Sequence, residues 1–311
     1  MTAFFAYMKT AALQVAILYV LVLVGFICDK TKLFTEEASK RTIDLLLYIV
    51  TPCMIINAFL EMDATPRIIQ RFFYSLALMF LTHFIAILMN LLFFHGKDEQ
   101  NPVFKYASIY GNVGFMGLPL AQAVIGAEGV LYCTSGLIAF NVITFIHGFK
   151  MMGGSQYHLN VKSLLTNPGI LSVVIGLPLF LLKIKLPTVI AEPISLVAGL
   201  NAPVAMIIFG TYLSHTNLLT MFLEKRIYLV AFLKLIVLPL ICIFGYRFIG
   251  VKGSLLVACT ITACVPSGNN TFMFASKFHK DAGKASQIVA LVSVFSIITM
   301  PVMIALAQTI H

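Results

Sequence analysis

Charged residues are scarce in this sequence. Of its 311 residues, 11% are Asp, Glu, Lys or Arg, whereas 60% are hydrophobic. A soluble domain carries about 25% charged residues, which cover the surface that it presents to water. A soluble protein of this length could not cover its surface with so few charges. The composition therefore excludes an ordinary soluble domain and indicates that lipid surrounds most of the chain.

The motifs of several enzyme and metal-protein classes are also missing. The sequence contains neither HExxH nor GxSxG, and no second histidine stands beside His83, which argues against an intramembrane enzyme. The six cysteines form no CxxC pair and no Cys/His ligand spacing, so we expect them to be small buried apolar side chains. Neither a metal nor a cofactor is expected.

Apolar stretches fill almost the whole length of the chain. A helix that crosses a bilayer needs about 20 apolar residues. The predicted spans are residues 8–28, 42–60, 72–94, 103–125, 128–151, 167–183, 189–213, 227–249, 254–278 and 282–309. These runs are continuously apolar, which favours helices over the alternating strands of a membrane barrel. The connector 153–167 is too short to fold alone, so we predict an all-α membrane protein with ten transmembrane helices and no soluble domain.

The basic residues are distributed unevenly between the two sets of loops. The net charge is +9, which the preference of Lys and Arg for cytoplasmic loops explains without a nucleic-acid partner. Seven Lys and Arg precede odd-numbered spans, and thirteen follow them, with the loop Asp29–Arg41 contributing most. We therefore predict a multi-pass protein of the cell membrane with both termini on the non-cytoplasmic side.

The two halves of the chain carry matching marks. Ten spans divide into five and five, and an odd number per half requires the second half to be inverted in the membrane. The matched pairs are Thr51-Pro52 with Ala202-Pro203, Pro119 with Pro266, and His83 with Lys234, at offsets of 151, 147 and 151 residues. We expect two inverted repeats, residues 1–151 and 152–311, an architecture common among secondary transporters.

Helix-breaking residues interrupt the fourth and ninth predicted spans, at Gly111–Pro119 and Val265–Asn270. In a helix interior, Gly costs about 1 kcal/mol and Pro about 3 kcal/mol relative to Ala. Within a membrane, unwound backbone is tolerated only where protein or a water-filled cavity satisfies it, and the exposed N-termini of half-helices favour anions. The predicted substrate-binding residues are Asn112, Gly114, Gly117, Pro119, Asn141, Pro266, Ser267, Asn269, Asn270 and Lys234.

Other polar residues within the spans allow more than one interpretation. Lys234 is either an anion attractor or counter-charge near the breaks, or a side chain that snorkels to the interface. His83 is either a proton carrier or a satisfied interior histidine. Asn57 and Asn141 are the amides that we place nearest a substrate path, although polar contacts between helices also explain such residues.

The carboxylates lie in loops or near the ends of spans, and none is expected in the middle of the membrane. A sodium/proton antiporter needs an intramembrane carboxylate to exchange its proton. The absence of such a residue argues against a cation exchanger and favours an anion carrier. A sodium-coupled symporter stays open, because amide oxygens and unwound carbonyls can hold sodium without a carboxylate.

At the two breaks the sequence resembles the auxin efflux carrier family, which includes PIN-type auxin exporters and bacterial malate and malonate permeases. Residues 111–120, GNVGFMGLPL, are similar to the fourth-helix signature of that family, and residues 265–275, VPSGNNTFMFA, to its ninth helix. Further similarities are residues 50–52, residues 167–169, and Lys234 placed five residues before Pro239. The short connector between spans 5 and 6 resembles that of the bacterial branch.

This resemblance implies a specific architecture and activity. Helices 1, 2, 6 and 7 would form a scaffold that makes a homodimer, and helices 3–5 and 8–10 a transport domain that moves as an elevator. Helices 4 and 9 would cross at Pro119 and Pro266, and Asn112 matches a substrate-contacting asparagine. The implied substrates are small organic anions, such as malate, malonate or auxin-like acids. The alternative is a sodium-coupled organic-anion symporter of the related bile-acid-symporter-like fold.

Overall fold

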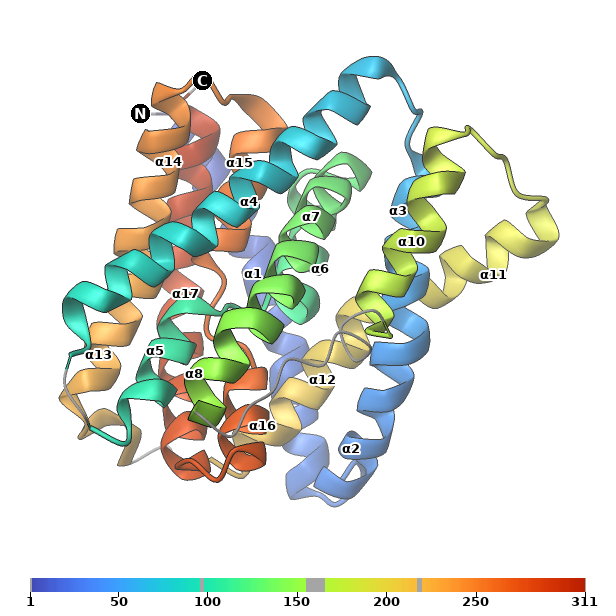
Figure 1. Cartoon of the computed structure of the whole chain (residues 1–311). Coiled ribbons are helices and arrows are strands. Elements are labelled where there is room, and N and C mark those ends of the chain that lie inside the picture. The colour runs from blue at the N-terminus through green and yellow to red at the C-terminus, as the bar shows by residue number, and fades with distance from the viewer. Residues whose placement is uncertain (1, 96–97, 155–165, 217–219, 311) are drawn as a thin grey trace.

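The computed structural model describes residues 2–95, 98–154, 166–216 and 220–310, and nearly all of this part of the chain is helical (Figure 1). Within these ranges, seven apolar helices are long enough to cross a bilayer: Ala3–Lys30, Glu36–Glu61, Pro66–Phe93, Ala127–Gly153, Thr188–Ser214, Lys225–Phe248 and Ala282–Thr309. Each overlaps one predicted span. The other three predicted ranges overlap the shorter apolar helices Val113–Val124, Pro168–Leu181 and Gly253–Cys264. Lys97 and Lys162, which the charge count includes, and most of the connector 153–167 lie outside the described residues.

The helical elements follow one another with short connections. In the first half they are α1 (Thr2–Lys30), α2 (Glu36–Leu45), η1 (Leu46–Val50), α3 (Thr51–Glu61), α4 (Pro66–Phe93), α5 (Asn101–Ile109), η2 (Val113–Gly117), α6 (Leu118–Val124), α7 (Ala127–Ile143), η3 (Thr144–Gly148) and α8 (Phe149–Gly153). In the second half they are α10 (Pro168–Leu181), α11 (Thr188–Ala198), α12 (Asn201–Ser214), η5 (Thr220–Phe222), α13 (Lys225–Phe232), η6 (Leu233–Val237), α14 (Leu238–Phe248), α15 (Gly253–Cys264), α16 (Asn270–Lys277) and α17 (Ala282–Thr309).

Among the described helices, five that begin at loops are capped by a side chain. Thr35, Thr65, Asn167, Glu224 and Asp281 precede α2, α4, α10, α13 and α17, and each accepts a hydrogen bond from a backbone N–H of the first turn. These N–H groups have no partner within their own helix, so a side-chain oxygen at the cap stabilises the helix by about 1 kcal/mol.

In the part of the chain that the structure describes, four π-helical turns interrupt the longer helices. Three of them, η1, η2 and η6, end two residues before Pro52, Pro119 and Pro239. A proline has no N–H to donate, and its ring clashes with the carbonyl group four residues earlier. Because that carbonyl group lies in the π-helical turn each time, the wider turn accommodates the proline without breaking the helix. Such turns are often found at functional sites.

The helices form two groups, which Figure 1 shows side by side. One group contains α2, α3, α10, α11 and α12, and the other contains α4–α8 and α13–α17. Helix α1 packs along α12 of the first group and α17 of the second. Its approach to α12 is close: a Cβ atom on Gly210 would lie 1.9 Å from the carbonyl oxygen of Val22, so no larger residue fits there.

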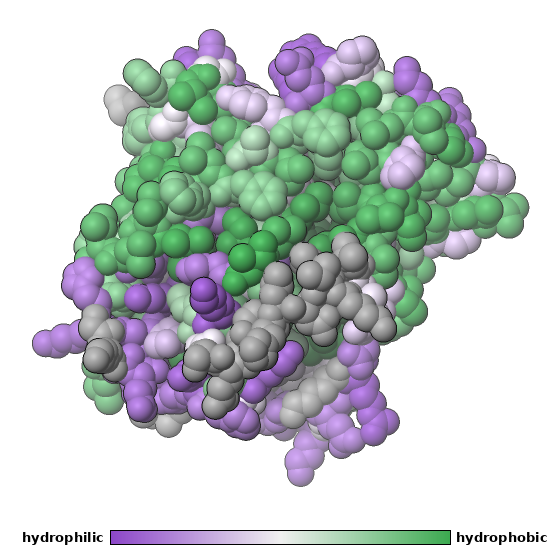
Figure 2. All heavy atoms as spheres, viewed as in Figure 1, coloured by the Kyte–Doolittle hydropathy of each residue, from purple (hydrophilic) through white to green (hydrophobic). Residues whose placement is uncertain are grey.

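The exterior is that of a membrane protein. Figure 2 shows an apolar band across the molecule, with hydrophilic side chains gathered at the end where α2 and α16 begin or end. Large apolar residues are exposed on the outer helices, for example Val189 at 86% and Leu196 at 73%. Water would disfavour such a surface, whereas lipid tails would cover it. Both chain termini lie at the end opposite α2 and α16 (Figure 1).

Candidate functional site at the helix crossing

Two unwound segments meet at the centre of the larger helix group. Tyr110, Gly111 and Asn112 separate α5 from η2, and residues 265–269 separate α15 from α16. Gly111 and Ser267 form an antiparallel bridge. The N–H of Asn112 donates to the carbonyl oxygen of Pro266 at 2.8 Å, and the N–H of Gly268 donates to that of Tyr110 at 3.3 Å. The two breaks therefore satisfy part of each other's backbone, as unwound segments in a membrane must.

Side chains satisfy further carbonyl groups at the C-terminal end of α5. The Ser267 hydroxyl donates to the carbonyl oxygen of Ala107 at 2.7 Å, and the Lys234 ammonium donates to that of Ile109 at 3.3 Å. Lys234 is 2% exposed. A cation is favourable at this position because the C-terminus of a helix carries partial negative charge. Lys234 thus acts as a counter-charge at the first break.

The N-terminal ends at the same crossing have no side-chain caps. Asn112 precedes η2 and Asn269 precedes α16, yet neither side chain accepts a hydrogen bond from the following turn. Asparagine is among the best capping residues, and five other helices of this chain use a cap. Among the described residues, neither carboxamide has a hydrogen-bond partner, although Asn112 is only 6% exposed and Asn269 9%. Their amide atoms are not among the fully buried polar atoms that lack a partner, so a ligand or water in the adjoining space can reach and bind them.

A cavity of about 300 Å³ adjoins this crossing. Its walls come from η1 and α3, from η2, from α7 to α8, from the start of α10, and from α16, so it lies between the two helix groups. Five amide side chains line it: Asn112, Asn141, Asn167, Asn269 and Asn270. Six aromatic side chains also line it: Tyr48, Phe115, Phe140, Phe145, Phe149 and Phe274. Amides surrounded by apolar walls are typical of a small-molecule site.

The structure brings half of the predicted site residues to this cavity. Those that line it are Asn112, Gly114, Asn141, Asn269 and Asn270. Those that do not line it are Gly117, Pro119, Pro266, Ser267 and Lys234. Pro266, Ser267 and Lys234 hold the two breaks together, whereas Gly117 ends η2 and Pro119 lies within α6. The backbone pairing is at Gly111 rather than at Pro119, where the crossing was expected.

Comparison with known proteins identifies the family of this chain. The sequence pattern of a family described as membrane transport protein matches residues 10–163 and 156–304, which together span almost the whole chain. The chain belongs to the membrane transport protein family. The resemblance to the auxin efflux carriers, noted at residues 111–120 and 265–275, is thereby confirmed. One relative, the "Uncharacterized transporter MJ1031" of Methanocaldococcus jannaschii, is 22% identical over 299 residues, covering 92% of this chain and 95% of the relative.

In this membrane transport protein, several residues that line the cavity were not predicted from the sequence. Lys277 ends α16 and lines the cavity, although its position near a span end placed it among the loop cations. Thr51 and Asn167 also line it. Both belong to segments that resemble the family, residues 50–52 and 167–169. The sequence alone does not show which way their side chains point.

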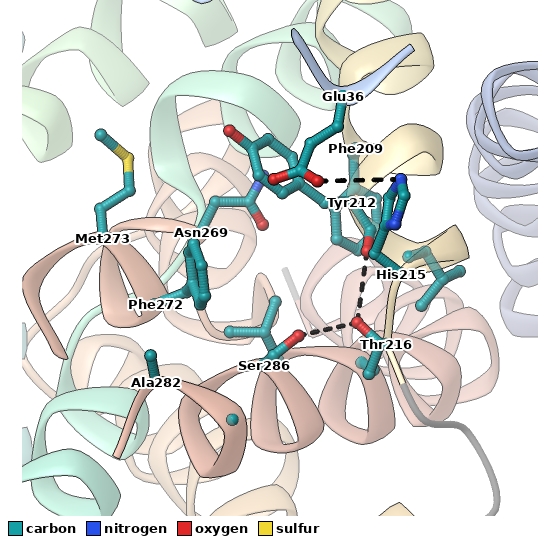
Figure 3. Close-up of a pocket in the computed structure, with 14 residues that line it drawn as sticks. Glu36, Phe209, Tyr212, His215, Thr216, Asn269, Phe272, Met273, Ala282 and Ser286 are labelled. Atoms are coloured by element: carbon teal, nitrogen blue, oxygen red, sulfur yellow. Dashed lines mark hydrogen bonds and ion pairs between the residues drawn. The ribbon is translucent and has the colours of Figure 1, made fainter. Parts of the chain in front are cut away.

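The transporter has a second cavity on the other side of α16, of about 200 Å³ (Figure 3). It lies between α12, α16 and α17 and shares Asn269 and Met273 with the crossing cavity. His215 contacts Asp29 at 2.9 Å and Glu36 at 4.0 Å at its edge. The two cavities thus differ in charge, because the Glu36 carboxylate and the His215 imidazole line the second one.

Two other polar residues lie away from the crossing cavity. His83 is buried, and its Nδ1 lies 2.8 Å from the carbonyl oxygen of Met79 in its own helix, while its ring packs against Tyr110. Asn57 donates to Glu61 at 2.8 Å on α3 and does not line the cavity. Of the two amides expected near a substrate path, Asn141 therefore lies at the cavity and Asn57 does not.

Proposed function

We propose that this protein is a secondary transporter of small organic anions and that it holds them in the crossing cavity. The observation that carries the proposal is the pair of buried, uncapped asparagines, Asn112 and Asn269, at the starts of η2 and α16. Their carboxamides and the first N–H groups of the two half-helices would donate hydrogen bonds to a carboxylate. The positive ends of the two helix dipoles would also favour its negative charge.

The charge of the cavity supports an anionic substrate. Among the described residues that line it there is one cation, Lys277, and there is no Asp or Glu. An organic cation would find no counter-charge here, and burying an unpaired charge is costly. The aromatic walls suit the apolar part of an organic acid. Malate, malonate and auxin-like acids are therefore the first compounds to test.

The proposal includes the architecture expected from the sequence. The ten spans form two inverted repeats, residues 1–151 and 152–311, with helices 1, 2, 6 and 7 as a dimerising scaffold. The group that contains both breaks moves against that scaffold as an elevator. A cavity between the two helix groups, rather than within one of them, fits such a motion, because the bound substrate would travel with one wall.

The membrane orientation is part of the same proposal. Both termini lie at one end of the molecule, and the basic loop Asp29–Arg41 lies at the other (Figure 1). Because basic loops favour the cytoplasm, we place the termini on the non-cytoplasmic side of the cell membrane. The end of the molecule that contains α2 and Lys277 then faces the cytoplasm.

Binding of carboxylates to purified protein tests the function directly. A ligand that binds only the folded protein raises its thermal unfolding midpoint. A panel of mono- and dicarboxylates, with their neutral amides, should give at least one acid that stabilises the protein while its amide does not. Removal of one side chain that hydrogen-bonds to a charged ligand weakens binding by about 1.5–3 kcal/mol, or about 10- to 150-fold. We expect this loss in Asn112→Ala.

Asn57→Ala is the matched control, because Asn57 is also an asparagine within a helix but lies outside the cavity. Uptake of the stabilising acid into vesicles should fail for Asn112→Ala and persist for Asn57→Ala. Normal uptake by Asn112→Ala would contradict a substrate site at the crossing. Repeating wild-type uptake without sodium separates the proposed carrier from the sodium-coupled symporter.

A further inference from the structure

One face of α16 connects the floor of the crossing cavity to its outer end. Asn270 begins this helix at the crossing, Phe274 follows one turn later, and Lys277 ends the helix, and all three line the cavity. At a rise of about 1.5 Å per residue, Lys277 lies about 10 Å along the helix axis from Asn270. The lysine is exposed, so it marks the open end of the cavity.

The ammonium group of Lys277 lies over aromatic rings rather than beside a carboxylate. It is 5.2 Å from the ring centroid of Phe149 and 5.9 Å from that of Phe278, and Phe149 also lines the cavity. Such contacts hold an ammonium group weakly, by about 0.5–1 kcal/mol at exposed sites. The ion pairs among the described residues do not include Lys277. Its charge is therefore not cancelled by an acidic partner in this part of the chain.

An exposed lysine at the end of a membrane helix also has a simpler explanation. Such side chains snorkel to the interface, and a cation is favourable at a helix C-terminus. Lys280 provides the comparison, because it follows three residues later, just beyond the end of α16, and does not line the cavity. What distinguishes Lys277 is its place on the cavity wall, where a low-dielectric cleft strengthens the field of a single charge and raises the local concentration of counter-ions.

We propose that Lys277 makes the cavity mouth electropositive and draws carboxylate substrates in before they reach the asparagines at the floor. The inference rests on the proposed function for the identity of the anion. It assigns Lys277 to capture rather than to final binding, so its loss should slow entry of anions without changing the floor of the cavity.

Thiol modification measures the electrostatic effect without knowledge of the substrate. We would replace Asn270 with cysteine as a reporter at the floor, in a chain with Cys28→Ser and Cys53→Ser, since the other four cysteines are buried. The rates of modification by an anionic sulfonate methanethiosulfonate and by its cationic trimethylammonium counterpart are then compared. The ratio of the two rates cancels differences in general accessibility.

Lys277→Gln should lower the anion-to-cation rate ratio about threefold to tenfold, because a unit charge about 10 Å away acts oppositely on the two reagents. Lys277→Arg should restore the ratio, Lys277→Glu should lower it further, and high salt should reduce all these differences. Lys280→Gln should leave the ratio unchanged. An unchanged ratio in Lys277→Gln, or an equal fall in Lys280→Gln, would overturn the proposal in favour of a snorkelling side chain.

Uptake by the chain without the reporter cysteine separates this inference from the proposed function. For an acid that the wild type transports, Lys277→Gln should raise KM about threefold to tenfold with little change in maximal rate. If the wild type transports no organic acid, the proposed function fails, whereas the reagent ratio still decides whether Lys277 governs entry of anions. A fall in maximal rate with unchanged KM would contradict a capture role.

Discussion

The two helix breaks pair with each other but are stabilised differently. At the first break, the carbonyl groups of Ala107 and Ile109 accept hydrogen bonds from Ser267 and Lys234. At the second break, the carbonyl group of Ile261 accepts from the backbone N–H of Val265, and no described cation bonds to the end of α15. The first break is thus held by side chains from facing segments, including a buried ammonium, whereas the end of α15 is also bonded by Thr262 and Cys264 of its own helix.

The difference between the breaks extends to the residues that the proposed repeat pairs. Lys234 and His83 occupy matching places in the two halves of the sequence. If the halves were equivalent, His83 would contact the second break as Lys234 contacts the first. Instead His83 bonds within its own helix and packs against Tyr110, which belongs to the first break. Both basic residues therefore contact the first break. At the second break, Asn269 lines both cavities.

The largest expected effect tests whether the two breaks share the substrate. Asn112→Ala should weaken binding of a stabilising acid by about 1.5–3 kcal/mol, because it removes a donor to a charged group. Asn269→Ala should weaken it less, since Asn269 divides its position between two cavities. Calorimetric titration of both variants measures the difference. Equal losses would mean that the breaks contribute equally and that their asymmetry does not affect binding.

The next effect concerns the buried ammonium. Lys234→Met should lower the free energy of unfolding by about 2 kcal/mol, because the carbonyl group of Ile109 loses a charged partner in a buried place. His83→Gln should cost less, since His83 bonds only within its own helix. Thermal unfolding in detergent compares the two variants. A larger loss for His83→Gln would show that the first break does not depend on Lys234.

Much of the fold and the location of the candidate site could be predicted from the sequence. Continuous apolar runs located the helices, since the bilayer fixes their length. Clusters of Gly, Asn and Pro located both breaks, because such residues are costly in a helix. Asn112 and Asn270 were expected at the site and do line the cavity.

The rest depends on three-dimensional packing that local sequence does not encode. Pro119 was expected at the crossing, yet the wider π-helical turn η2 accommodates it within a continuous helix. The chain unwinds earlier, at Gly111. Lys234 was open to several interpretations until its contact with Ile109 was known. Lys277 was counted with the loops, because no pattern shows that the last turn of α16 borders a cavity.

A smaller effect tests how tightly each break is packed. A Cβ atom on Gly111 would lie 2.8 Å from Cγ2 of Val265 and 3.0 Å from Nζ of Lys234, whereas one on Gly268 would lie 3.3 Å from the nearest atom. Overpacking costs about 1–3 kcal/mol, and we expect Gly111→Ala near the lower end, because the atoms it meets belong to side-chain ends. Gly268→Ala should cost less than 1 kcal/mol on the same scale. The reverse order of unfolding midpoints would show that the second break is the tighter one.

A comparably small effect separates the side-chain contribution of the crossing from its backbone contribution. Ser267→Ala removes the hydroxyl that donates to the carbonyl oxygen of Ala107 but keeps the backbone bonds of Asn112 and Gly268. We expect a loss of about 1 kcal/mol in the free energy of unfolding, the usual value for one neutral hydrogen bond, and little change in ligand affinity, because Ser267 does not line the cavity. A large fall in affinity without a fall in stability would instead place the Ser267 hydroxyl against the substrate. The backbone bridge alone would then hold the two breaks together, and the first break would differ from the second only through Lys234.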